Sequence, residues 1–87
     1  MNTKNGTLEN EEYVVGLKQT LRALENDKAK KILIGRDADK KMLTRAKEMA
    51  MKHSVKIELI DTMELLGNMA GLKVGAVSIA LLKPENN

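Results

Sequence analysis

The sequence lacks the residues on which several classes of protein depend. It contains no cysteine, phenylalanine or tryptophan, and it has a single aromatic residue, Tyr13, and a single histidine, His53. Without cysteine the chain has no disulfide framework, zinc ribbon or thiol nucleophile. The single histidine also argues against a histidine-rich metal site and against a Ser-His-Asp triad. The shortage of aromatic side chains also argues against nucleic-acid readers that stack bases on rows of aromatics.

Long apolar runs are missing as well. The longest, Ala76 to Leu82, has seven residues and is interrupted by Ser78, whereas a membrane-spanning helix needs about 20. The first residues are polar and acidic, unlike an apolar signal sequence. We therefore expect a monomeric cytoplasmic protein that has no membrane partner.

The chain is long enough for one domain. Its 87 residues are 43% hydrophobic, which is ordinary for a globular protein, and the core must be built from Leu, Ile, Val, Met and Ala. We expect a flexible lead-in over residues 1–10, a single domain over 11–83 and a short tail over 84–87.

Positive charge is concentrated in the first half of the chain. The net charge is only +3, but residues 13–56 hold 12 basic and 5 acidic side chains, and the segments before and after this block are each net acidic. Such a block suits a polyanionic partner. Lysines that merely solvate helix faces would give the same count, so charge alone leaves both interpretations open.

Hydrophobic periodicity predicts alternating strands and helices. Leu17, Leu21 and Leu24 form a helical stripe, and Ile32 to Ile34 is an apolar run typical of a strand buried on both faces. Helices are expected at 17–25, at 40–52 and from Asp61 to just before Gly71, and strands at 13–15, around 32–34, at 55–60 and at 76–82. This order predicts an α/β protein, a three-layer α/β/α sandwich with a four-stranded mixed sheet.

One constellation of polar side chains stands out. Lys18, Gln19 and Arg22 follow Gly16 and lie within an arc of about 100° on the first expected helix. Lys and Arg donate hydrogen bonds to guanine edges, Gln either donates or accepts, and glycine lets the backbone approach a ligand closely. The alternative is that these side chains form the solvent-exposed face of an amphipathic helix and bind no ligand.

Other candidate sites are weaker. Asp37 and Asp39 follow a strand and could hold Mg²⁺, but a helix cap by Asp39 and a loop hydrogen bond by Asp37 explain them better. His53 ends a helix, where we expect a partly buried or capping role. We therefore expect no cofactor, no metal and no enzymatic activity, and an enzyme acting through Asp37 and Asp39 is the least favoured interpretation.

Several separated motifs resemble one known family. They are YVVGLKQTLRAL at 13–24, KAKKILI at 28–34, Asp37-Ala38-Asp39, Leu65-Leu66-Gly67 and the segment Gly71–Ala76. In order and spacing these are similar to the kink-turn RNA-binding ribosomal-protein superfamily, whose ribosomal branches are the large-subunit "seven-Ae" and "thirty-e" types. The GLKQT form is most like the small bacterial, YbxF-like members.

The resemblance implies a function. Members of the family bind a sharply bent helix–internal loop–helix RNA that contains tandem sheared G·A pairs. By position, the segment from Gly16 to Arg22 would enter the widened major groove, where Lys18, Gln19 and Arg22 would contact guanines and nearby phosphates.

A loop and an acidic residue complete the site that the resemblance implies. Leu72, Lys73 and Val74 would form an apolar loop that covers a flipped-out nucleotide, and Asp37 would be a secondary contact. The expected function is recognition of a kink-turn RNA, such as a ribosomal RNA or a riboswitch, and stabilisation of its bent form. The alternative is a structural or protein-interaction subunit of a ribonucleoprotein assembly without independent kink-turn specificity.

The sequence departs from the archaeal and eukaryotic pattern of that family. An Asn-Glu pair stands there in place of Lys18 and Gln19, a Lys in place of Arg22, an acidic residue in place of Arg36 and a Pro in place of Lys40. The departures add basic character, which favours an RNA partner.

Overall fold

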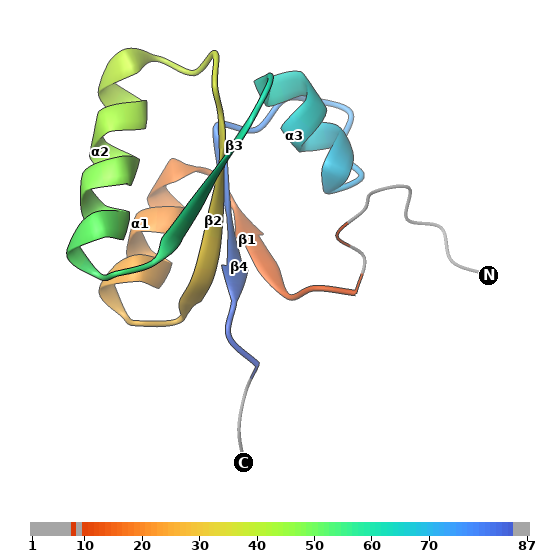
Figure 1. Cartoon of the computed structure of the whole chain (residues 1–87). Coiled ribbons are helices and arrows are strands. Elements are labelled where there is room, and N and C mark those ends of the chain that lie inside the picture. The colour runs from red at the N-terminus through yellow and green to blue at the C-terminus, as the bar shows by residue number, and fades with distance from the viewer. Residues whose placement is uncertain (1–7, 9, 85–87) are drawn as a thin grey trace.

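A computed structural model describes residue 8 and residues 10–84 of the chain (Figure 1). Most of the expected lead-in, residues 1–7 and 9, and most of the expected tail, residues 85–87, lie outside the described residues. No helix in the described part is long and apolar enough to cross a membrane.

The predicted order of strands and helices is confirmed. The chain runs β1 (Tyr13–Val15), α1 (Leu17–Glu25), β2 (Ala29–Gly35), α2 (Lys40–Lys52), β3 (Lys56–Ile60), α3 (Met63–Met69) and β4 (Ser78–Leu82). The bounds of β2, β3, α3 and β4 differ from the prediction by one to three residues. Helix α3 begins at Met63 because the hydroxyl of Thr62, and not the carboxylate of Asp61, accepts a hydrogen bond from the Leu65 amide. Strand β4 begins at Ser78, two residues later than its apolar run.

The four strands form one mixed sheet in the order β1-β4-β2-β3. Strands β2 and β3 are parallel, and β4 is antiparallel to both of its neighbours. Val15 therefore pairs with Ile79, and Ile34 pairs with Ser78. As a result β1, β2 and β3 all finish, and β4 begins, at one end of the sheet. We call this the site end and the opposite one the far end.

Helices cover both faces of the sheet, as the prediction of a three-layer sandwich requires (Figure 1). Ile32 and Ile34 point toward α1 and α2 on one face, and Leu33 between them joins Leu66 of α3 and Ile79 on the other. All these side chains are buried. Because alternate residues of a strand face opposite sides, an uninterrupted apolar run such as β2 supplies both cores.

In each helix the buried face includes fewer of the large apolar side chains than their spacing in the sequence predicts. In α1 Leu24 is buried, but Leu17 and Leu21 are only half-buried, because the inner face is completed by Thr20 and Ala23. In α3 Leu65 is 46% exposed, since Leu66 and Gly67 form the buried face. In α2 Ala46 and Ala50 are buried, whereas Met42 remains 39% exposed.

Candidate functional site

Four segments meet at the site end. They are the start of α1 after Gly16, the β2–α2 loop, the start of α3, and the loop between α3 and β4 (Figure 1). The sheet register brings them together, since each follows the end of β1, β2 or β3 or precedes the start of β4. All eight residues predicted from the sequence to form the site lie on these segments or on the first two turns of α1.

Gly16 forms the entry to α1 in a backbone conformation that needs glycine. Its φ of 106° and ψ of 156° lie in a region that is essentially restricted to glycine. Its amide donates a hydrogen bond of 2.8 Å to the Ser78 carbonyl, which fixes the start of α1 against β4. A Cβ built on Gly16 would meet nothing within 4 Å. The glycine therefore serves the turn and leaves open space in front of it.

The three polar side chains of α1 that were predicted to bind RNA are exposed, and the two cations among them have no anionic partner in the described chain. Lys18, Gln19 and Arg22 all lie on the solvent side. Helix α1 has no acidic residue in its first turn, and among the described residues neither Lys18 nor Arg22 forms an ion pair. Cationic groups in this arrangement are free to bind an anion.

A buried polar contact that the sequence did not reveal holds α1 in place. The hydroxyls of Thr20 and Ser78, both fully buried, share a hydrogen bond of 2.9 Å. It joins the inner face of α1 to the first residue of β4, directly after the loop that precedes this strand. The available signal was Thr20 itself, a polar residue on what proves to be the buried face of the helix.

The loop between α3 and β4 is fastened to α3 at several points. The amide of Leu72 donates to the Gly67 carbonyl at 2.9 Å, and the amide of Ala76 donates to the Met63 carbonyl at 2.9 Å. Leu72 is half-buried against the core, whereas Val74 is 70% exposed and Lys73 is also exposed. The loop therefore presents a valine to solvent on a fixed backbone.

Gly67 makes this attachment possible. A Cβ on Gly67 would overlap the carbonyl oxygen of Val74, and one on Gly75 would lie 3.2 Å from backbone atoms of Met63. Neither glycine is among the site residues predicted from the sequence. Gly71, in contrast, has a φ of 74° directly after the Ala70 C-cap, as expected for a glycine that ends a helix.

The two aspartates of the β2–α2 loop act as acceptors for helix amides. Asp39 accepts from the Lys41 amide at 2.8 Å, which confirms the predicted N-cap of α2. Asp37 accepts from the Met63 amide at 2.8 Å, so it links the loop to the start of α3 and does not bond its own loop as expected. The described residues contain no group of three or more His, Asp and Glu side chains placed to hold a metal. His53 is the half-buried C-cap of α2, as predicted.

Comparisons with known proteins agree with the motifs. Residues 2–87 match the family described as "Ribosomal protein L7Ae/L30e/S12e/Gadd45 family". An RNA-binding protein, TTE2299, from Caldanaerobacter subterraneus is 43% identical over 67 residues, which cover 77% of this chain and 82% of the relative. The RNA-binding protein YbxF of Geobacillus stearothermophilus is 33% identical over 70 residues, covering 80% and 85% of the two chains.

Solved structures show the same fold. The Giardia lamblia 15.5kD RNA binding protein superimposes with a TM-score of 0.80 at 18% identity, over 92% of this chain and 67% of the other. A Bacillus halodurans protein of unknown function gives a TM-score of 0.76 at 15% identity, over 82% and 71% of the chains. The protein thus belongs to the L7Ae/L30e/S12e/Gadd45 family of ribosomal proteins and resembles its bacterial YbxF-like members.

Proposed function

We propose that this protein is a non-enzymatic RNA-binding protein that recognises a kink-turn at the site end and stabilises its bent form. The observation that carries the proposal is the juxtaposition, at one end of the sheet, of an exposed basic helix start and an exposed aliphatic loop. Relatives that match most of the chain are named RNA-binding proteins, which supports RNA as the ligand.

The α1 segment provides the polar half of recognition. Lys18 and Arg22 would donate hydrogen bonds to guanine edges and phosphates, and Gln19 would pair with a base edge. The open space in front of Gly16 lets the RNA approach the backbone. Because neither cation is held by a carboxylate within the described chain, RNA binding to Lys18 and Arg22 breaks no ion pair among the described residues.

The loop between α3 and β4 provides the apolar half. With no Phe or Trp in the chain, a displaced base would be covered by aliphatic surface, to which Val74 contributes most. An exposed valine on a fixed loop gains from burial under a base, as apolar surface does when it leaves water. Lys73 beside it adds a positive charge, and Asp37 is a secondary contact in this proposal.

Binding at both halves favours the bent RNA. In this proposal only the bent internal loop places its guanines on α1 and its displaced nucleotide on Val74 at once. A protein that binds the bent state more tightly raises the population of that state by its differential affinity, which offsets the cost of deforming the RNA.

A mobility-shift comparison tests this function. The probes are a kink-turn RNA and a plain RNA duplex of equal length, each titrated with protein at low and at moderate salt. We expect selective binding of the kink-turn that persists at moderate salt. Equal binding of both RNAs that salt erases would show charge attraction only, and would favour a ribonucleoprotein subunit without kink-turn specificity.

Substitutions on α1 test the polar contacts. Lys18→Ala and Arg22→Ala should each weaken kink-turn binding by about 1 to 3 kcal/mol. Lys28→Ala and Lys56→Ala are matched controls, because both lysines are exposed, unpaired among the described residues and located at the far end. Titrations by mobility shift measure all four variants. Unchanged affinity in both α1 variants would remove this face from the site.

Val74→Asp tests the apolar contact. Because Val74 is largely exposed, the substitution should leave the thermal midpoint unchanged while it weakens the RNA complex by about 2 kcal/mol or more. Leu72 is unsuitable for this purpose, since it packs on the core and a charge there would destabilise the fold. Full RNA affinity in the Val74 variant would contradict the assignment of the loop.

A further inference from the structure

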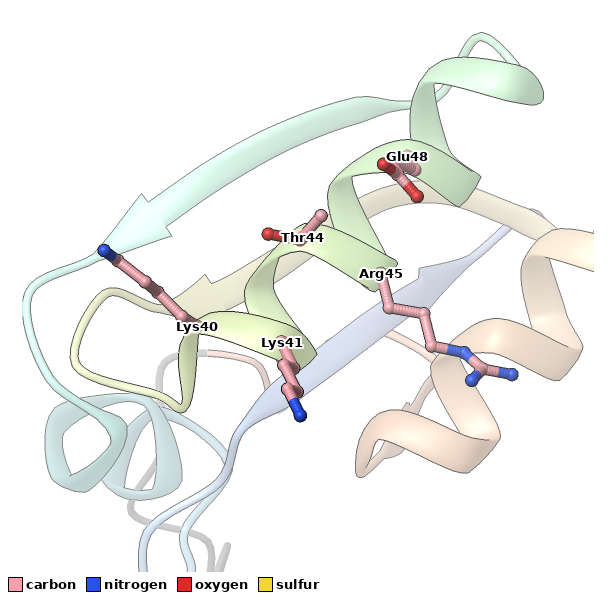
Figure 2. Close-up of a pocket in the computed structure, with 5 residues that line it drawn as sticks. All are labelled: Lys40, Lys41, Thr44, Arg45 and Glu48. Atoms are coloured by element: carbon pink, nitrogen blue, oxygen red, sulfur yellow. The ribbon is translucent and has the colours of Figure 1, made fainter.

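The outer face of α2 carries a second group of cations that the proposed site does not use. The helix holds five basic side chains and one acidic side chain, Glu48. A shallow hollow on its surface is lined by Lys40, Lys41, Thr44, Arg45 and Glu48 (Figure 2). All five of these side chains are exposed.

The cations of the hollow are not neutralised by the protein. The ion pairs among the described residues involve other lysines, at positions 30, 31 and 83. Arg45 and Glu48 have a spacing that permits a helical ion pair, yet none forms, and Figure 2 shows the Arg45 guanidinium pointing away from Glu48 toward α1. Lys41 and Arg45, four residues apart, are a like-charge pair that destabilises an isolated helix. A bound anion would relieve this repulsion.

The hollow lies where an RNA held at the site end can reach it. Helices α1 and α2 pack side by side on the same face of the sheet, and both begin at the site end (Figure 1). The opposite face is different, because the only charged residue of α3 is Glu64, in its first turn. A polyanion that extends beyond the site is therefore attracted more strongly over α2 than over α3.

We infer that the hollow on α2 binds the sugar–phosphate backbone of one of the two stems that flank the bend. Lys41 and Arg45 supply the charge, and the Thr44 hydroxyl is placed to donate a hydrogen bond to a phosphate oxygen. The contact is independent of base sequence. The inference rests on the proposed function, because the bent RNA at the site end determines where the stem runs.

The test compares two double variants that remove equal charge. Lys41→Gln with Arg45→Gln alters the hollow, and Lys28→Gln with Lys56→Gln alters exposed, unpaired lysines at the far end. Kink-turn affinity is measured over a range of salt concentrations, and circular dichroism melting shows that both variants fold. The α2 variant should bind about tenfold more weakly at low salt, and its log K–log salt slope should fall by about 0.9 for each lost phosphate contact. The far-end variant should keep the parent's slope. Equal behaviour of the two variants would overturn the inference.

Shortened RNAs locate the contact. When one stem is truncated close to the internal loop, the α2 variant and the parent should bind alike, whereas truncation of the other stem should preserve their difference. A difference that survives both truncations would place the contact at the bend and contradict the stem assignment. If the parent shows no preference for kink-turn RNA, the proposed function fails, and the same two variants compared on plain duplex decide the α2 contact alone. If the α2 variant binds every RNA as tightly as the parent does, the inference is wrong, and this face would instead suit an acidic protein partner.

Discussion

The two ends of the sheet differ in how many of their basic side chains form ion pairs. Toward the far end three lysines pair with carboxylates: Lys30 with Glu11 at 3.1 Å, Lys83 with Asp27 at 3.0 Å, and Lys31 with Glu58. Other lysines there, among them Lys28 and Lys56, have no such partner among the described residues. At the site end no basic side chain in the described chain has a carboxylate within 4.0 Å. The unpaired basic residues there are Lys18, Arg36, Lys40, Lys41 and Lys73, and Arg22 and Arg45 follow them further along α1 and α2.

This difference indicates that the two ends serve different purposes. Helices α1 and α2 have no acidic residue in their first turns, although acidic groups there would favour the helix dipole. Helix α3, which begins at the same end, has Glu64 in its first turn. Helix α1 thus forgoes a small gain in stability and keeps its positive charge available to a ligand, whereas in α2 the acidic group at the helix start is the Asp39 cap. The far-end ion pairs are exposed and contribute little to stability.

The site end also concentrates the contacts that fix backbone positions. The buried Thr20–Ser78 hydrogen bond, the Asp37 bond to the start of α3 and the close approach of Val74 to Gly67 all lie there. If the site end is a binding surface, disturbing these contacts should reduce RNA affinity, whereas far-end substitutions should not.

Gly67→Ala should have the largest combined effect, because it lowers both the stability of the fold and the affinity for RNA. Alanine favours a helix over glycine by up to about 1 kcal/mol, but its Cβ would overlap the Val74 carbonyl. Forced overpacking of this kind costs about 1 to 3 kcal/mol, so we expect a lower free energy of unfolding and weaker RNA binding from a displaced loop. Gly71→Asn is the matched control, since asparagine tolerates the positive φ of that position. Denaturant titration and mobility shift measure both variants, and full stability and affinity in Gly67→Ala would show that the loop is not fixed there.

Thr20→Val should have an intermediate effect. The isosteric change leaves the Ser78 hydroxyl buried without its partner, which costs about 1 to 3 kcal/mol of unfolding free energy. Adding Ser78→Ala removes the stranded group and should restore most of the stability. Chemical denaturation of both variants measures this recovery, and a double variant no more stable than Thr20→Val would contradict the stated role of the hydrogen bond.

Lys31→Gln should have the smallest effect. It breaks the pair with Glu58, whose partly exposed groups contribute at most about 1 kcal/mol. Thermal melting should shift little and kink-turn affinity should stay at the parent's level. A loss of affinity comparable with that of Lys18→Ala would remove the distinction between the two ends.

The sequence predicted the fold well because its signals are local. The apolar run of β2, the Asp39 cap and the glycine after α3 each act within a few residues, so the order of elements and the three layers could be derived. The exact buried face of each helix could not be derived in this way, because the burial of Thr20 depends on Ser78, 58 residues away.

The positions of the charged residues in the fold were harder to predict from the sequence. The basic block over residues 13–56 divides between the two ends, because each β–α unit carries the chain across the sheet and back. Lys18 and Lys41 lie at the site end, whereas Lys31 and Lys56 lie toward the far end. The predicted site residues do lie toward one end of the sheet. They were identified from the family motifs, whereas composition alone does not distinguish them from other residues. Gly67 was missed because its role depends on the carbonyl of Val74.

The central claim is that binding at the site end stabilises a bent RNA, and energy transfer across a kink-turn labelled at both stem ends tests it most directly. Adding protein should raise the transfer efficiency to a plateau, and a Lys18→Ala, Arg22→Ala double variant should give no rise at the concentration that saturates the parent. RNA that binds the protein without a change in transfer, or that bends equally with the double variant, would contradict the claim.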